Sequence, residues 1–280
     1  MNKNFQMPRV IERSYSRAID RLLKGLQREL AHVASPFFIA DVLRRLARSP
    51  TFALSCRKIA RAMATQLFSD GHKTWRQAAA AGSKGRLIFE SLQRELASPR
   101  VASTFDRIIS QNAELIQSMP ITLAGRVSHM VAQGYERGLR PEALIKHVLA
   151  EYPHMTESHA RLIARTETSK ASTALTQVRA AEAGLEWYVW RTSEDARVRS
   201  AHAHMDGVVI PWSEAPAPEE LNGEKSQGSY HAGNIYNCRC YPEPLIRFDQ
   251  VAWPAKVYLN GKIQRMSLAK FKKLLPGGEL

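Results

Sequence analysis

Most side chains with catalytic or metal-binding potential lie between residues 195 and 240. This segment holds two of the three cysteines and three of the nine histidines. It contains, in chain order, Asp195, Arg197, Arg199, His202, His204, Asp206, Gly207, His231, Asn237, Cys238, Arg239 and Cys240. Three chemistries use these residue types at this density: a metal site, a catalytic centre, and a network of hydrogen bonds that holds loops together.

The cysteines and two of the histidines form a candidate structural zinc site. Thiolate and imidazole are the ligands that zinc prefers, and four of them complete a closed tetrahedral site. The candidate ligands are His202, His231, Cys238 and Cys240. A zinc ion would fasten the loops of a region that has few strands and a small core. The Cys-x-Cys spacing is shorter than the usual zinc-knuckle spacing, and the sequence indicates no other cofactor.

The same residues define an alternative, a metal- or thiol-dependent hydrolase. In a thiol enzyme, Cys238 or Cys240 would attack, His202 or His231 would act as base, and Asp195 would orient the base. A metal-dependent nuclease would instead use Asp195, His202, Asp206 and His231. The segment shows no oxyanion-hole pattern and no paired carboxylates. We therefore expect no catalytic residue here.

The third interpretation is a polar network without a reaction. In it, Arg197 or Arg199 pairs with a carboxylate such as Glu167 in a charge-assisted hydrogen bond. The histidines bond to backbone groups, and the cysteines fill small buried volumes. This arrangement accounts for all the residue types present.

The first 152 residues predict a basic, all-helical region. Apolar residues recur at spacings of three and four. The expected helices cover 8–32, a stretch from Pro36 to Ser49-Pro50, 51–68, 86–97, 101–118, 122–137 and 141–151. Turns are expected at Asp70-Gly71, between Pro120 and Gly125, and over 138–141. Residues 78–84 have the composition of a flexible segment.

A small α+β domain with short antiparallel strands is expected over 153–248. A helix should begin at Thr156 and end at Gly184. The aromatic and β-branched residues of 186–192 and 208–210 predict strands, and residues 213–230 predict a long loop. A basic tail, 249–280, should contain a hairpin with an Asn260-Gly261 turn and a short helix over 268–275. The fold class is therefore mainly α with a small α+β domain.

Charge is distributed unevenly in this chain of net charge +14. Residues 1–150 hold 24 Lys/Arg against 11 Asp/Glu, whereas residues 151–250 hold 10 against 14. Such a basic surface favours non-specific association with double-stranded DNA. No motif for sequence-specific DNA binding is present. The sequence predicts no membrane span, and its first ten residues lack the apolar core of a signal peptide, so we expect a cytosolic origin.

The ordered motifs resemble those of the phage Mu F-like head-morphogenesis family, the minor head proteins of tailed phages and prophages. The resemblance covers roughly residues 155–246. It rests on Ala164-Arg165-Thr166-Glu167, Trp190-Arg-Thr192, Asp195-x-Arg197-Val-Arg199-x-x-His202, Asp206-Gly207 through Pro211-Trp212, His231-Ala232-Gly233 and Asn237-Cys238-Arg239-Cys240-Tyr-Pro-Glu-Pro. Where the family usually has His-Pro-Gly, this chain has alanine at position 232.

The resemblance implies a non-catalytic role in head morphogenesis and in DNA packaging or ejection. It implies a place in the virion, in the head interior or at the portal vertex, after assembly in the host cytoplasm. The expected partners are the portal protein, the major capsid or scaffold protein, and double-stranded DNA. The motif residues, given a structural role, are Arg165, Glu167, Asp195, Arg197, Arg199, Asp206, Gly207, Asn237 and Arg239.

Overall fold

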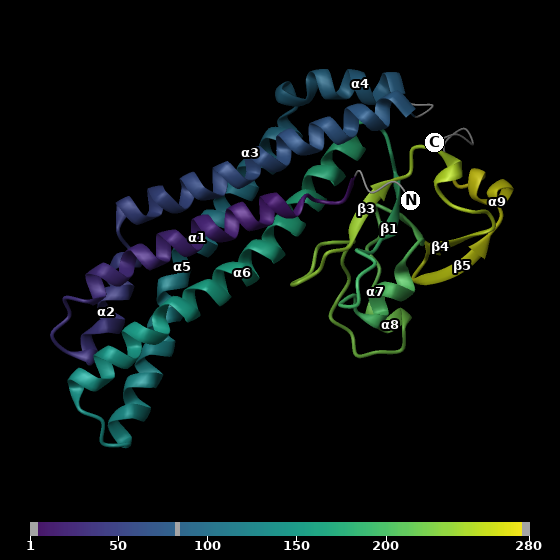
Figure 1. Ribbon diagram of the computed structural model, residues 1–280. Coiled ribbons are helices and arrows are strands. Elements are labelled where there is room, and N and C mark those ends of the chain that lie inside the picture. The colour runs from purple at the N-terminus through teal and green to yellow at the C-terminus, as the bar shows by residue number, and fades with distance from the viewer. Residues whose placement is uncertain (1–4, 82–84, 276–280) are drawn as a thin grey trace. The chain divides into compact units, whose positions relative to one another are not determined.

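The computed structural model describes residues 5–81 and 85–275 and divides the chain into two compact units. The first, which we call the helical unit, combines Arg9–Thr65 and Asp106–Ala164. The second, the mixed unit, combines Met1–Pro8, Gln66–Phe105 and Arg165–Leu280. The chain therefore passes between the units several times, because the long helices α3, α5 and α6 contribute residues to both (Figure 1).

The helical unit is built from α1 (Arg9–Leu30), α2 (Pro36–Ala47) and parts of α3 (Pro50–Ala81), α5 (Pro99–Glu136) and α6 (Pro141–Glu182). The buried face of α1 carries Ile11, Tyr15, Ile19, Leu23, Leu26 and Leu30, spaced three or four residues apart. Such spacing places apolar side chains on one helix face. Hydrogen bonds join the helices: the Tyr15 hydroxyl donates to Asn112 Oδ1 at 2.8 Å, and the Tyr152 hydroxyl donates to the Leu23 carbonyl at 3.2 Å.

Two expected interruptions are wrong: the link between Pro120 and Gly125, and the helix start at Thr156. Helix α5 continues through Pro120, and α6 continues through Pro153 and Thr156. Proline removes one backbone hydrogen bond and tends to bend a helix, but tertiary packing can outweigh that cost. Thr156 is not a cap, because its hydroxyl bonds to the Pro153 carbonyl at 2.9 Å and to Asp20 Oδ1 at 3.2 Å.

The turn expected at Asp70-Gly71 is also wrong, because α3 runs through both residues. The glycine has a packing role instead. A Cβ atom on Gly71 would lie 2.1 Å from Nη1 of Arg179. The buried guanidinium of Arg179 pairs with the buried carboxylate of Glu95 and donates to the Phe68 carbonyl at 2.9 Å. Gly71 therefore makes room for a buried ion pair of the mixed unit. Helix α3 includes residues 78–81, while positions 82–84 of the expected flexible segment lie outside the described residues.

The mixed unit contains a five-stranded sheet in the order β3-β1-β2-β4-β5. The strands are β1 (Trp187–Arg191), β2 (Val209–Pro211), β3 (Tyr241–Pro244), β4 (Ala255–Leu259) and β5 (Lys262–Met266). All pairings are antiparallel except that of β2 with β4, which corrects the expectation of antiparallel strands only. Strand β3 was not predicted, because its Tyr-Pro-Glu-Pro sequence disfavours a strand. At the sheet edge, prolines are tolerated.

The predicted Asn260-Gly261 hairpin is confirmed, with positive φ values of 51° and 75° at the two turn residues. Helix α9 (Leu268–Lys272) follows it. Because β4 pairs with β2, this hairpin belongs to the same sheet as β1 to β3. The compact units therefore differ from the expected ranges 1–152, 153–248 and 249–280, since strand pairing joins segments that are distant in sequence.

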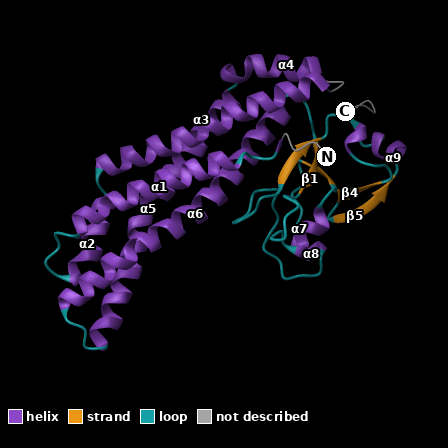
Figure 2. Ribbon diagram, in the orientation of Figure 1, coloured by secondary structure: helices purple, strands orange, loops and turns teal. Residues whose placement is uncertain are grey.

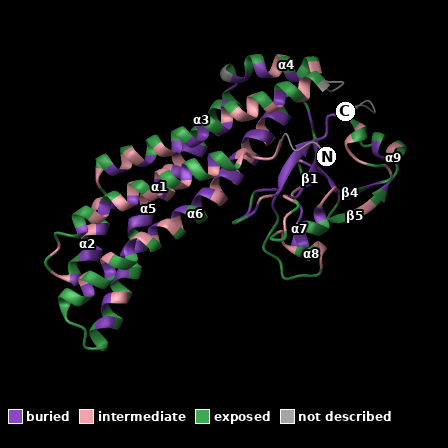
Figure 3. Ribbon diagram, in the orientation of Figure 1, coloured by how far each residue is buried: buried purple, intermediate pink, exposed green. Residues whose placement is uncertain are grey.

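Strand β1 is buried along its whole length and supplies side chains to two apolar clusters (Figure 3). Tyr188 and Trp190 belong to a cluster that also contains Cys238 and Cys240. Trp187 and Val189 belong to a second cluster, which includes Phe271 of α9. This alternation is the period-two pattern of a strand. It places the cysteines against one face of β1.

The predicted fold class, mainly α with a small α+β domain, is confirmed (Figure 2). The remaining short elements are α4 (Gly85–Arg94), η2 (Glu95–Ala97), α7 (Ser200–Met205), α8 (Pro218–Leu221) and η3 (Phe248–Gln250). None of the helices in the described part of the chain combines the length and apolar character that a membrane span requires.

The Arg179–Glu95 pair gives a test of this fold. We expect Glu95→Ala to lower the free energy of unfolding of the mixed unit by about 3–5 kcal/mol, because it leaves a buried guanidinium without its partner. The control Glu90→Ala removes an exposed partner of Arg86 and should cost at most about 1 kcal/mol. All five tryptophans lie in the mixed unit, so urea unfolding followed by tryptophan fluorescence reports on it. Equal losses in the two variants would contradict the role of the buried pair.

Candidate functional site

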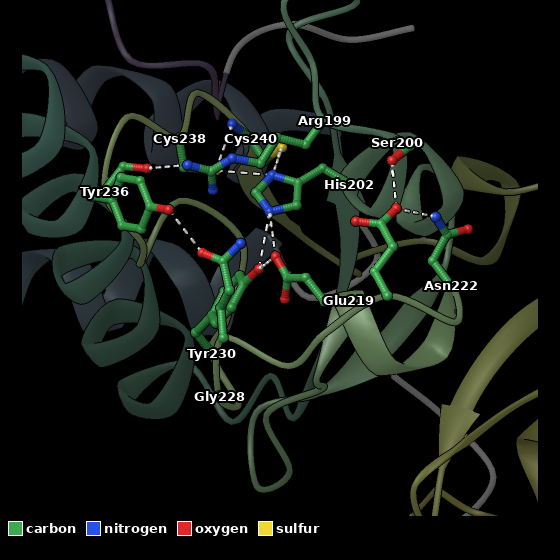
Figure 4. A network of polar contacts seen from close by, with 12 residues as sticks. Arg199, Ser200, His202, Glu219, Asn222, Gly228, Tyr230, Tyr236, Cys238 and Cys240 are labelled. Atoms are coloured by element: carbon green, nitrogen blue, oxygen red, sulfur yellow. Dashed lines mark hydrogen bonds and ion pairs between the residues drawn. The ribbon is translucent and has the colours of Figure 1, made fainter.

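The structure brings together three of the four predicted zinc ligands: His202, Cys238 and Cys240 (Figure 4). His202 lies on α7, and the cysteines lie on the segment that leads into β3. His202 Nδ1 is 3.5 Å from the Sγ atom of each cysteine. The residues are only 2%, 3% and 4% exposed. Among the described residues, this is a compact, buried group of soft donor atoms within 4.8 Å of one another.

A buried tyrosine and a buried glutamate fix the orientation of the His202 ring. The Tyr230 hydroxyl lies 3.0 Å from His202 Nε2 and donates to Glu219 Oε1 at 2.5 Å. A phenol has a single proton, so its oxygen must accept the Nε2 proton of His202. The Nδ1 lone pair then faces the two sulfur atoms. Burial raises the pKa of Tyr230, and the bond to Glu219 raises it further, so the phenol stays protonated.

The hydrogen bond between the two cysteines shifts their pKa values in opposite directions. The hydrogen bond from Cys240 lowers the pKa of the Cys238 thiol below its ordinary value, against the opposing effect of burial. The same bond and burial raise the pKa of Cys240. The backbone amide of Cys240 also donates to Cys238 Sγ at 3.4 Å. Cys238 is therefore the sulfur whose negative charge the structure favours.

The fourth predicted ligand, His231, lies outside this group. Its Nδ1 is 3.1 Å from the Tyr188 hydroxyl, and its ring packs against Trp212 with centroids 5.3 Å apart. Burial lowers the pKa of His231 to about 4, so the ring is neutral at neutral pH. Sequence could not separate the two histidines, because both lie at compatible distances along the chain from the cysteines.

The carboxylates invoked for the enzyme alternatives bond to groups other than the histidines. Asp195 bonds to Arg239 at 2.6 and 2.8 Å and accepts from the Arg197 amide at 3.0 Å. Partial burial would raise the pKa of Asp195, but these contacts lower it overall. Asp206 accepts from the backbone amide of Thr192 at 2.8 Å. The metal-ligand group found among the described residues contains neither aspartate. Asp195 thus takes part in an ion pair with Arg239, on the loop that carries the cysteines.

Arg197 pairs with a carboxylate as expected, but its partner is Asp195 and not Glu167, which was the example given. Glu167 pairs with Lys170, one helical turn further along α6, at 3.2 Å. Arg199 donates to the Tyr236 carbonyl at 3.0 Å, and its guanidinium lies 4.5 Å from the centre of the Tyr236 ring. Arg197 Nε lies 3.9 Å from Asp195 Oδ1. These arginines therefore hold the loops around the cluster, with partners on the loops themselves.

Helix α6 fixes the segment that carries the cysteines. The Thr173 hydroxyl donates to the Ala232 carbonyl at 2.7 Å, and Thr166 Oγ1 accepts from the Asn237 amide at 3.1 Å. Gly233 has a φ of +83°, and a Cβ atom there would lie 2.6 Å from Thr173 Oγ1 and 2.8 Å from the Cys240 carbonyl. The His231-Ala232-Gly233 motif therefore needs its glycine for both conformation and space.

Sequence reasoning missed four residues of this network: Thr166, Thr173, Glu219 and Tyr230. Thr166 was noted only as part of a motif. A signal was available for the threonines, since Thr166, Ser169 and Thr173 recur at helical spacing and form one polar stripe on a helix. No comparable pattern marks Glu219 and Tyr230, which lie in what was expected to be a long loop. Both are buried.

Comparisons with known proteins agree with these motifs. The family model described as Phage Mu protein F like protein matches residues 125–242. A Haemophilus influenzae protein, described as an uncharacterized protein, is 32% identical over 152 residues. The match covers 53% of this chain and 31% of the relative, so the chain spans less than a third of that protein's length. No solved structure matches significantly.

Replacement of Gly233 tests the contact between the loop and α6. Alanine at 233 adds a Cβ atom at 2.6–3.0 Å from Thr173, Cys240 and Ser169, in addition to the strain of a positive φ. Gly223 is the matched control, since its φ is +74° and a Cβ atom there meets nothing within 4 Å. Gly223→Ala should cost about 1–2 kcal/mol from backbone strain alone. Gly233→Ala should cost at least about 1 kcal/mol more. Similar losses in fluorescence-monitored urea unfolding would show that the close contact carries no energy.

Proposed function

Residues 125–242 belong to the Phage Mu protein F like family, and from this membership we propose that the chain is a minor head protein of a tailed phage or prophage. In this role it acts in head morphogenesis and in DNA packaging or ejection. Its partners are the portal protein, the major capsid or scaffold protein, and double-stranded DNA. It assembles in the host cytoplasm and resides in the virion, in the head interior or at the portal vertex.

The observation that carries this proposal is that sequence motifs far apart in the chain contact one another in the mixed unit. Helix α6 bonds to both loop motifs, through Thr173 to the Ala232 carbonyl and through Thr166 to the Asn237 amide. The motifs therefore support one another in a locked domain with a defined surface. A domain whose surface loops are fixed in this way can bind a partner in an assembly with little change of shape.

We propose a non-catalytic role for the buried cluster. A substrate would have to reach side chains that are 2–4% exposed. In a hydrolytic metal site, the glutamate that takes a proton from the metal-bound water must lie on the side of the histidine ring that faces the metal. Glu219 lies 3.8 Å from His202 Nε2, whereas the sulfurs face Nδ1 on the other side of the ring. The geometry supports a structural cluster better than a hydrolytic one.

Helix α1 supplies a surface suited to DNA. Residues 9–65 hold 12 Lys/Arg against 4 Asp/Glu, whereas residues 106–164 hold 6 against 6. The basic excess of the helical unit therefore comes from α1, α2 and the start of α3. On α1 the exposed arginines are Arg9, Arg13, Arg17, Arg21 and Arg28. At 3.6 residues per turn they fall within about a third of the helix circumference, away from the buried apolar face.

Deletion of the gene in the phage or prophage that encodes the protein tests the head role. We expect particles that lack the protein to show defective head assembly or reduced infectivity, with restoration by the gene supplied in trans. In wild-type particles the protein should co-purify with mature heads and the portal. Normal heads with full infectivity after deletion would contradict the proposal.

The arginine face of α1 has its own test. The triple variant Arg13→Gln, Arg17→Gln, Arg21→Gln should weaken binding to duplex DNA of any sequence. It should reduce the slope of log K against log salt concentration by up to about 2.7, since each lost phosphate contact contributes about 0.9. The control triple Arg107→Gln, Arg137→Gln, Arg140→Gln removes three exposed charges from the electrically balanced part of the helical unit. Fluorescence anisotropy measures both slopes, and equal changes would assign binding to net charge alone.

A further inference from the structure

We propose that His202 Nδ1, Cys238 Sγ and Cys240 Sγ bind a single Zn²⁺ ion that locks the loops of the mixed unit. The proposal goes beyond the head role and does not depend on it. His231, the fourth residue expected from sequence, is excluded from the ligand set by its contacts with Tyr188 and Trp212. The remaining position of a tetrahedral ion is then taken by a non-protein ligand, water in the simplest case.

The two distances from His202 Nδ1 to the cysteine sulfurs match those that a tetrahedral zinc ion imposes. With Zn–S near 2.3 Å and Zn–N near 2.0–2.1 Å, nitrogen and sulfur ligands lie about 3.6 Å apart. The two observed Nδ1–Sγ distances are both 3.5 Å. A thiol–imidazole hydrogen bond accounts for one of these contacts only, because Nδ1 has a single lone pair. A metal ion in front of that lone pair contacts all three donors at once.

The surroundings of His202 have the pattern found behind metal-bound histidines. Such histidines usually donate their second N–H to a carboxylate, a backbone carbonyl or a water, which fixes the ring and raises its basicity; in this chain a phenol oxygen takes that place. Here His202 Nε2 faces the Tyr230 oxygen, and Tyr230 donates to Glu219. The Glu219 carboxylate is 1% exposed, and its Oε2 has no hydrogen-bond partner among the described residues. Zinc bound at Nδ1 would polarise the imidazole and strengthen the hydrogen bond from Nε2–H to the Tyr230 oxygen, and Tyr230 in turn donates to Glu219.

The elements that meet at the cluster are too short to be stable alone. Helix α7 has six residues, α8 has four, and β3 has four. Isolated helices of this length do not persist in water. A metal ion that joins residue 202 to residues 238 and 240 closes a loop of more than 30 residues and limits the unfolded state. The proposed ion is therefore structural, and its removal should loosen α7, α8 and the segment before β3.

The metal content of the full-length protein tests the proposal. The protein is purified without a metal-affinity tag, and zinc is measured by inductively coupled plasma mass spectrometry. We expect about one zinc per chain in the wild type and loss of that zinc in Cys238→Ala and Cys240→Ala. The matched controls Cys56→Ala and His231→Gln remove a buried cysteine and a partly buried histidine outside the cluster, and both should retain zinc. Loss of zinc in His231→Gln but not in the cysteine variants would overturn the assignment.

Two further experiments test the zinc site even if the cysteine variants fail to fold. Refolding the wild type with Co²⁺ in place of Zn²⁺ should give a thiolate-to-metal charge-transfer absorption. Tyr230→Phe keeps all three ligands but removes the oxygen that His202 Nε2 contacts, and it should weaken zinc affinity about 10- to 100-fold in chelator competition. Wild-type protein with no bound metal, no cobalt absorption and either three free thiols or a Cys238–Cys240 disulfide would overturn the proposal. These results do not depend on whether the protein is found in heads.

Discussion

The mixed unit depends on the hydrogen bonds between the threonine face of α6 and the backbone of residues 232–237. They determine where Cys238 and Cys240 lie, because Thr166 and Thr173 hold both ends of the segment that precedes the cysteines. A small change in these hydrogen bonds would therefore move the cysteines. If the Ala232 carbonyl moved away from Thr173, Gly233 would no longer pack against the helix, and the cysteines would leave His202. The geometry of the cluster is therefore set by a helix that contributes no atom to it.

The second constraint is the burial of polar and charged groups in a unit with short elements. Arg179–Glu95, Arg191–Glu243 and the His202–Tyr230–Glu219 chain are all buried. Such groups are stable only when partners satisfy them, so each restricts the backbone to one arrangement. Apolar packing alone would leave loops such as 213–230 with many alternative conformations. The buried Glu219, from the middle of that loop, shows how one carboxylate fixes the loop's position.

The sequence predicted what depends on local periodicity. The amphipathic helix of 9–30, the strand of 187–191 and the Asn260-Gly261 hairpin follow from spacing and turn chemistry. The errors arose where tertiary packing reversed a local preference. Gly71 looked like a turn residue, but the Arg179 guanidinium occupies the space that its Cβ would fill. Pro120 predicted a break and Thr156 a helix start, but α5 and α6 continue through these residues. At the site, residue types pointed to the segment in which His202, Cys238 and Cys240 come together, while only the fold could separate His202 from His231.

The two parts of the proposed function rest on different segments. The family match begins at residue 125, so it includes none of the basic excess in residues 9–65. Within the helical unit, the matched part lies in a stretch with balanced charge. The family match therefore supports the proposed head role but says nothing about the arginine face of α1. Conversely, the exposed arginines of α1 are not needed for packing, because the apolar residues on the buried face hold the helix in place. The proposed DNA surface and the domain that carries the motifs can therefore vary independently, and a variant that abolishes one should leave the other intact.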